Sequence, residues 1–294
     1  MQAKDTFFSR KSTINCRGEF FDLSRPRIMG ILNITPDSFY DGGKYTNHTH
    51  IVDHVQQMIK EGCDILDIGA YSSRPGAKEI SEKEEINRLS PVLELLRKHF
   101  PNIIISTDTF RARVADHVIQ NFQVEIINDI SSGDLDLHMF EVIANHQVPY
   151  IMMHMQGTPQ NMQKNPQYQN VVKEVIGYFA KKVNQLRLLG VHDLIIDPGF
   201  GFGKTVEHNY RLLRHLDDFK IFELPILAGL SRKSMICKYL NISPNEALNG
   251  TSVLNTLALL GGANILRVHD VKEAKETVLL TQQFLSSRAD NWYD

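Results

Sequence analysis

Short apolar runs rich in β-branched residues recur along the whole chain. Within each run the apolar residues are continuous, whereas a strand with one solvent-facing side alternates apolar and polar positions. Continuous runs of this length are typical of parallel strands that are buried on both faces. The runs are RIMGIL (27–32), DILDIG (64–69), NIIIST (102–107), VEIIND (124–129), PYIMMH (149–154), DLIID (193–197), LPILAG (224–229) and NILRV (264–268).

Longer stretches with apolar residues at helical spacing lie between the runs, and one follows the last run. The clearest are residues 50–62, 81–100, 168–190, 245–262 and 271–287. Strands that alternate with helices predict an α/β fold, and eight such units in one chain favour a single (β/α)8 TIM barrel. An open parallel sheet is the alternative.

The chain before the first unit has a different pattern. Residues 13–23 read TINCRGEFFDL, in which a polar Arg-Gly turn separates two extended pieces. This pattern predicts a β-hairpin, which we expect to cover the floor of the barrel. No linker-like tract divides the sequence, so we expect one domain over residues 1–294, with residues 1–26 as an N-terminal extension.

The composition is that of a soluble globular protein, with 42% hydrophobic residues, 22% charged residues and a formal net charge of −2. This balance gives no general attraction to nucleic acid or to a membrane surface. The sequence has three separated cysteines, Cys16, Cys63 and Cys237, and their spacing fits a reducing compartment such as the cytoplasm. No apolar stretch approaches the roughly 20 residues of a membrane helix.

The stretch DPGFGFGKT (197–205) superficially resembles a phosphate-binding loop. The nucleotide-binding pattern G-x-x-x-x-G-K-[ST] needs a glycine where this chain has Pro198, and the glycines at 199, 201 and 203 do not fit G-x-G-x-x-G. The informative residue is therefore Asp197, at the end of an apolar run. We interpret Lys204 as a solvated or structural charge outside the site.

Polar residues follow nearly every apolar run. In a parallel barrel these positions meet at the mouth formed by the carboxyl ends of the strands, where active sites lie. Charges gathered in one cavity destabilise the fold unless a ligand or an ion interacts with them. In chain order the residues are Asn33, Ser72, Ser73, Arg74, Asp108, Asn128, Asp129, His154, Asp197, Ser231 to Lys233, Arg267 and His269.

These side chains fall into two chemical groups. Asp108, Asn128 and Asp197 offer acceptors for a flat heterocycle with adjacent N–H groups. Donors suited to an anion such as a phosphate are supplied by Arg74, Arg267 and His269. A small-molecule substrate with a heterocyclic head and a phosphorylated tail would satisfy both groups.

The assembled motifs closely resemble the dihydropteroate synthase family between about residues 27 and 271. The order and spacing of many pieces carry the resemblance, since any single piece would be weak. They are MGILNITPDSFYDGG (29–43), SSRPGA (72–77), DT (108–109), IIND (126–129), MMHMQGTP (152–159), DPGFGFGKT, GLSRKSMI (229–236) and LRVHDV (266–271).

The resemblance implies a transferase of folate biosynthesis that joins dihydropterin pyrophosphate to p-aminobenzoate, with Mg²⁺ as cofactor. It also implies a homodimer. In this reading the pterin pocket is formed by Asp108, Asn128, Asp197 and Lys233. Asn33 meets the magnesium–pyrophosphate unit, and the anion site is completed by Arg74, Arg267 and His269. The p-aminobenzoate side is assigned to Phe39, Asp41, Ser73, Arg74, Pro75, Phe202 and Ser231, and the residues implied in catalysis are Asn33, Asp108, Lys233, Arg267 and His269.

The sequence departs from the family pattern at two places. GAYSSRPG stands where G-G-E-S-T-R-P-G is commoner, and DTFR stands where DTSK is commoner. Two rival functions remain open: a methyltransferase that binds methyltetrahydrofolate, and a catalytically silent pterin-binding paralogue. The anion-binding residues and the NITPDSF loop argue against the first, and the intact set of site residues argues against the second.

Overall fold

The computed structural model describes residues 12–34, 44–71 and 79–287. Eight parallel strands form one sheet in the order β8-β7-β6-β5-β4-β3-β10-β9. Their bounds are β3 (Arg27–Asn33), β4 (Ile65–Gly69), β5 (Ile104–Asp108), β6 (Ile126–Asp129), β7 (Tyr150–Met153), β8 (Leu194–Asp197), β9 (Leu227–Ala228) and β10 (Ile265–Val268). A parallel bridge between Ile196 and Ile226 joins the two ends of this order, so the predicted (β/α)8 barrel is confirmed and the open sheet is excluded.

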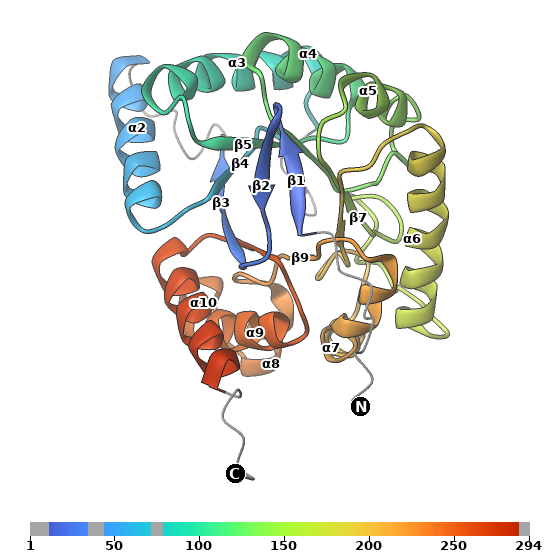
Figure 1. The fold of residues 1–294 in the computed structure, drawn as a ribbon. Coiled ribbons are helices and arrows are strands. Elements are labelled where there is room, and N and C mark those ends of the chain that lie inside the picture. Colours follow the sequence, from blue (N-terminus) through green and yellow to red (C-terminus); the bar gives the residue numbers. More distant parts are fainter. Residues whose placement is uncertain (1–11, 35–43, 72–78, 288–294) are drawn as a thin grey trace, which may run out of the picture.

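Helices follow the strands and surround the barrel (Figure 1). The four longest helices overlap the stretches with helical spacing. Apolar residues on their inner faces pack against the outer face of the strands. Within the described ranges the helices are α2 (Lys44–Lys60), α3 (Glu82–His99), α4 (Ala112–Phe122), α5 (Met139–His146), α6 (Val171–Leu188), α7 (Val206–Arg214), α8 (Ser234–Leu240), α9 (Leu248–Leu260) and α10 (Val271–Ser286), with 3-10 turns at Leu216–Phe222 and Pro244–Glu246. None of the helices in these ranges is both long and apolar enough to cross a membrane.

The N-terminal hairpin closes one end of the barrel, as predicted. Strands β1 (Thr13–Cys16) and β2 (Glu19–Asp22) pair antiparallel, and Arg17 and Gly18 turn between them with positive φ angles of 55° and 87°. Ile14, Cys16 and Leu23 are buried against the first inward-facing residues of the barrel strands. Figure 1 shows the hairpin lying across the centre of the ring of helices.

Inward-facing residues of the barrel change from apolar to polar along the strands. At the floor they form an apolar layer that includes Ile65, Ile126, Ile195 and Ile265. Alternate residues of a strand face the same side, so the next inward layer lies two residues further along each strand. That layer is mostly polar: it includes Asp67, Ser106, Asn128, Asp197 and Arg267, with Ile31 and Met153 as apolar members. The pattern therefore places the floor at the amino ends and the polar mouth at the carboxyl ends of the strands.

Candidate active site

Asp67 is the lowest charged residue of the polar layer, and its side chain is fully buried. The Ser106 hydroxyl donates to one of its carboxylate oxygens over 2.6 Å, and the Asn128 amide donates to the other over 3.2 Å. Strand register explains these contacts, because Asp67 pairs with Ser106 across β4 and β5. A buried carboxylate is tolerated when hydrogen bonds and a cation compensate for the lost water, and the cation here is Arg267.

Arg267 joins two carboxylates across the barrel interior. Its Nε donates to Asp67 over 2.6 Å, and its Nη2 donates to Asp108 over 2.8 Å. Arg267 lies on β10 whereas Asp67 and Asp108 lie on β4 and β5, so the three groups meet inside the barrel. The predicted anion-binding arginine therefore lies directly against the predicted pterin-binding carboxylate, and the two chemical groups are neighbours rather than opposite sides of the mouth.

Asp108, the last residue of β5, keeps 23% of its side chain exposed at the mouth. Burial by the surrounding protein raises the pKa of Asp108 to about 7, while Arg267 opposes this rise and Asp67 adds to it. Its strand neighbour Asn128 is 4% exposed and pairs with it in register. The two side chains thus present a carboxylate and an amide at one depth of the pocket.

Asp197 and Lys233 are neighbouring opposite charges at the mouth, and each shifts the pKa of the other. Burial raises the pKa of Asp197, and the Gly199 backbone N–H and the Lys233 cation oppose that rise. Burial also lowers the pKa of Lys233 to about 8, with Asp197 acting in the opposite direction and Arg267 in the same direction. Lys233 Nζ lies 4.2 Å from the centre of the Phe202 ring, a cation–π contact. Three predicted site residues are thereby brought together.

The glycines of DPGFGFGKT let the chain turn beside Asp197, as expected. Gly199 has φ +72°, and a Cβ there would lie 2.0 Å from the His154 carbonyl oxygen, so no other residue fits without moving the backbone. The Gly199 N–H donates to Asp197 over 2.8 Å. The turn therefore both positions the carboxylate and leaves space for the His154 carbonyl at the end of β7.

Lys204 is buried, with 4% of its surface exposed, so the structural interpretation is confirmed and the solvated one is wrong. Its ammonium lies 3.0 Å from each of the carbonyl oxygens of His154, Gly199 and Phe202, and 2.9 Å from His154 Nδ1. Burial lowers the pKa of Lys204 to about 7, partly opposed by Asp197. Burial together with Lys204 lowers the pKa of His154 to about 2, so this histidine is a neutral acceptor.

Ser231 and His269 form a hydrogen-bonded pair at the ends of the seventh and eighth strand units. The Ser231 hydroxyl accepts from the His269 backbone N–H over 3.2 Å and lies 3.0 Å from His269 Nδ1. Desolvation by the surrounding mouth, together with the Arg267 and Arg232 cations, lowers the pKa of His269 to about 4. His269 is therefore neutral at pH 7. If the Ser231 hydroxyl donates to Nδ1, the proton of the ring is on Nε2, which is a donor toward the mouth.

Asn33 ends β3 and is exposed at the mouth. It lies next to Gly69 of β4 in register, and β4 separates it from β5, which carries Asp108. The remaining predicted site residues lie outside the described residues: they are Phe39, Asp41, Ser73, Arg74 and Pro75. Their roles stay predictions.

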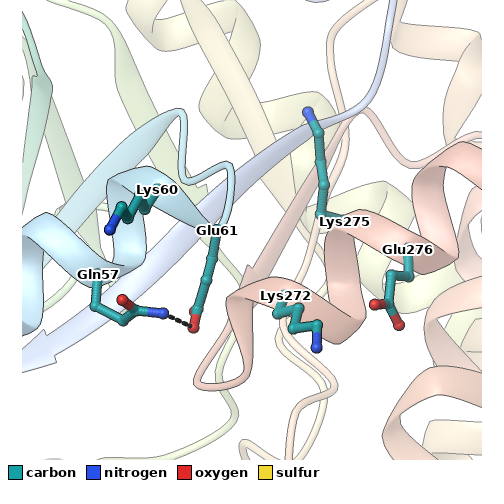
Figure 2. Close-up of a pocket in the computed structure, with 6 residues that line it drawn as sticks. All are labelled: Gln57, Lys60, Glu61, Lys272, Lys275 and Glu276. Atoms are coloured by element: carbon teal, nitrogen blue, oxygen red, sulfur yellow. Dashed lines mark hydrogen bonds between the residues drawn. The ribbon is translucent and has the colours of Figure 1, made fainter.

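Two cavities are lined by residues outside the predicted site set. One, of about 420 Å³, is lined by charged and polar residues of the end of α2 and the first turns of α10 (Figure 2). The other, of about 480 Å³, lies along residues 156–167. None of the predicted site residues lines either cavity, and no group of three or more histidine, cysteine or acidic side chains suited to a metal occurs within the described part of the chain.

Asp67 was not among the predicted site residues, and the structure shows its contact with Arg267. A signal was present in the run DILDIG, where a charged residue occupies the middle of a strand that is otherwise apolar. A charge in such a strand needs a buried partner. The partner could not be identified from the sequence because Arg267 lies 200 residues further along the chain.

Comparisons with known proteins agree with this geometry. Residues 29–269 match the family described as "Pterin binding enzyme". The chain is 42% identical to the dihydropteroate synthase of Escherichia coli (strain K12) over 280 residues, which cover 95% of this chain and 98% of the relative. A structure of Yersinia pestis dihydropteroate synthase in complex with a sulfonamide drug superposes with a TM-score of 0.86 at 41% identity, covering 93% of this chain and 99% of that one. The Xanthomonas albilineans dihydropteroate synthase with 4-aminobenzoic acid has a TM-score of 0.86 at 35% identity, over 95% of this chain and 99% of that one.

Proposed function

We propose that this chain, which belongs to the pterin-binding enzyme family and within it to the dihydropteroate synthases, joins dihydropterin methyl diphosphate to p-aminobenzoate and releases pyrophosphate. The products are dihydropteroate and pyrophosphate. The observation that carries the proposal is the contact of Arg267 with both Asp67 and Asp108. It sets a fixed cation for a departing anion directly beside a carboxylate that can hold a heterocycle.

In the proposed reaction the bond between the pterin methylene carbon and the diphosphate oxygen breaks, and the oxygen keeps the electron pair. The arylamine nitrogen forms the new bond to that carbon and then loses a proton. An arylamine is neutral at pH 7 and has an available lone pair, so catalysis needs mainly positioning and charge stabilisation. Asp108, Asn128 and Asp197 hold the heterocycle, and Lys233 donates to one of its acceptors.

Positive charge develops on the pterin and negative charge on the diphosphate as the bond breaks. Asp108 and Asp197 favour the first charge, and Arg267 favours the second. His269 acts as a neutral N–H donor, because its pKa of about 4 leaves it uncharged at pH 7. On the p-aminobenzoate side we place Phe202 and Ser231, with Phe39, Asp41, Ser73, Arg74 and Pro75 as resemblance implies.

Magnesium is part of the proposal. Mg²⁺ is usually held by one or two protein oxygens together with substrate phosphates and water, and the exposed side chain of Asn33 at the mouth can supply one oxygen. Bound there, the ion would neutralise charge on the diphosphate. Arg267 and His269 would contact the diphosphate independently of the ion.

The test is a coupled assay of purified protein with dihydropterin methyl diphosphate, p-aminobenzoate and magnesium, following pyrophosphate release. Formation of dihydropteroate in equal amount to pyrophosphate is the expected result. Pterin binding with no pyrophosphate release would support a silent pterin-binding protein instead. Methyl transfer from methyltetrahydrofolate, with no condensation, would support the methyltransferase.

The acid side of the pH profile should report Asp108. Asp108 accepts from the pterin as a carboxylate, and burial raises its pKa to about 7, so kcat/KM for the dihydropterin substrate should fall about tenfold per pH unit well below that value. Asp67 contributes to this raised pKa. The Asp67→Asn variant should therefore move the acid limb to lower pH, measured with the same substrate so that substrate ionisation cancels. The exposed residue Asp217 provides a control as Asp217→Asn, and an acid limb that stays in place in Asp67→Asn would contradict the assignment.

We also propose a homodimer that buries one face of α9 and α10. These helices pack against each other, yet Val253, Leu257, Leu280 and Phe284 remain exposed, with Leu280 73% exposed. Such a patch of large apolar side chains is typical of an association surface. Leu280→Glu should convert the dimer to a monomer in sedimentation velocity, whereas Leu188→Glu on α6, where Leu188 is 79% exposed, should not. A wild-type chain that sediments as a monomer would rule the dimer out.

A further inference from the structure

The described backbone pairing between β9 and β10 ends before the chain reaches the mouth. Its last partners are Ala228 and Leu266. Ser231 and His269 each lie three residues beyond these partners, so the backbone ladder does not set the spacing between them. Contacts between side chains therefore align the two segments, which carry the predicted anion-binding histidine and the predicted lysine of the pterin pocket.

Two pairs of side chains link these segments. The first is the hydrogen-bonded pair Ser231 and His269. The second is formed by the next residue of each segment: Arg232 Nε donates to Asp270 Oδ2 over 3.0 Å, and its Nη2 donates to Oδ1 over 2.5 Å. A guanidinium that contacts both oxygens of a carboxylate fixes orientation as well as distance. The second pair thus holds the segments directly beside the first.

Arg232 is also held through its backbone. Its φ angle is 54°, in the left-handed region that few residues other than glycine adopt. Its backbone N–H donates to the Thr251 hydroxyl of α9 over 3.1 Å, and Thr251 is buried. A non-glycine residue keeps such a conformation when the surrounding structure holds it. The Arg232 side chain therefore reaches Asp270 from a fixed point on the turn after β9.

We infer that Arg232 and Asp270 are positioning residues that hold the segments after β9 and β10 at the spacing at which Ser231 and His269 bond, and so align His269 with the departing diphosphate. The inference rests on the proposed function, in which His269 donates to that group. The side chains of the ion pair are 31% and 16% exposed, and ion pairs that water reaches contribute little to stability. Loss of the pair should therefore affect anion binding more than unfolding.

The opposite charges of the pair allow position to be separated from electrostatics. Burial has the largest effect on the pKa of His269 and lowers it; the Arg267 and Arg232 cations lower it further, and Asp270 raises it. By charge alone, loss of the Arg232 cation would weaken the binding of an anion, and loss of the Asp270 carboxylate would strengthen it. Loss of the link between the two segments weakens binding in both cases.

The test compares Arg232→Asn, Asp270→Asn and the double variant. Asparagine tolerates the left-handed backbone at position 232 and keeps the size of the side chain at position 270. Glu223→Asn is the matched control, because Glu223 is exposed and has a φ angle of 57°. Isothermal titration gives Kd for inorganic pyrophosphate with Mg²⁺ and Kd for hydroxymethylpterin, which lacks the diphosphate. Thermal unfolding gives Tm.

Arg232→Asn and Asp270→Asn should each raise Kd for pyrophosphate about tenfold, because a small displacement of a binding group is costly. Kd for hydroxymethylpterin should stay within about threefold of wild type, since the acceptors of the pterin pocket lie on β5, β6 and β8. The double variant should match the single variants within about threefold, because the two residues act as one link. Arg232→Lys keeps the charge without the planar fork, so its Kd should lie between those of wild type and Arg232→Asn.

Shifts of opposite direction in the two single variants would overturn the inference, since charge alone would then account for them. Unchanged Kd for pyrophosphate would also overturn it, as would equal losses for both ligands together with a lowered Tm. If Arg232→Asn does not fold, Asp270→Asn breaks the same ion pair and carries the same expectation. Failure of the proposed function is distinguishable from these outcomes, because the wild-type protein itself would then form no dihydropteroate.

Discussion

Arg267→Ala should lower kcat by roughly 10²–10³-fold at saturating substrates, which corresponds to the loss of about 2.7 to 4 kcal/mol of transition-state stabilisation. The guanidinium contacts Asp67 and Asp108 in the absence of substrate, so it is already in place when negative charge develops on the diphosphate. A preorganised donor does not have to reorganise during the reaction. The measurement is steady-state turnover, followed as pyrophosphate release.

Removing Arg267 also leaves the buried Asp67 carboxylate without its cation. Loss of one partner of a buried ion pair destabilises a fold by about 3 to 5 kcal/mol, so unfolding in urea must be measured beside the kinetics. Arg267→Lys keeps a charge but cannot donate to both carboxylates through a planar fork, and its kcat should lie between those of wild type and Arg267→Ala. Arg113→Ala is the surface control. Unchanged turnover in a folded Arg267→Ala protein would remove this residue from the mechanism.

Lys204→Met should lower the free energy of unfolding by about 3 kcal/mol or more, because each buried acceptor left without a donor costs about 1 to 3 kcal/mol. Three carbonyl oxygens lose the ammonium in this variant: those of His154 and Phe202 lose their donor, whereas that of Gly199 still accepts from the Phe202 backbone N–H over 3.1 Å. Methionine approximates the length of the lysine side chain, so the change tests the ammonium more than the packing. Chemical denaturation by urea gives the free energy directly.

Lys181, an exposed lysine of α6, provides the comparison for Lys204. Lys181→Met removes one charge from the surface, and its free energy of unfolding should stay within about 0.5 kcal/mol of wild type. The Lys204→Met protein should also bind the pterin substrate more weakly, since the same loop carries Asp197 and Phe202. Equal stability of the two lysine variants would show that the buried ammonium does not organise this loop.

The barrel could be predicted from the sequence because burial on both faces leaves a clear pattern. Each of the eight continuous apolar runs overlaps one strand of the sheet. The seventh run was predicted over residues 224–229, but the strand is limited to Leu227–Ala228. Pro225 has no backbone N–H to donate, and the chain turns into the loop that carries Ser231 and Lys233. Local backbone chemistry of this kind shortens a strand without changing the apolar pattern.

The depth and the partners of the site residues were harder to predict. The carboxyl ends of the strands correctly located Asp108, Asn128, Asp197, Lys233 and Arg267 at one mouth. Sorting these residues into acceptors and donors did not predict where they lie relative to one another. The donor Arg267 in fact binds the acceptor Asp108 directly. The burial of Lys204 was also hidden, since its carbonyl partners belong to the backbone and leave no mark in the residue types. Contacts across the barrel depend on the register of distant strands.

The junction between β8 and β9 has a mechanical consequence. The described backbone pairing there is a bridge between Ile196 and Ile226, supported by the Ile196 N–H donating to the Pro225 carbonyl over 2.9 Å, whereas other neighbouring strands pair over two to five residues. The described backbone ladder of the barrel wall is therefore shortest beside Asp197. We expect the wall to deform more easily there than between β3 and β5, where the ladders run over five and four residue pairs beside Asp108.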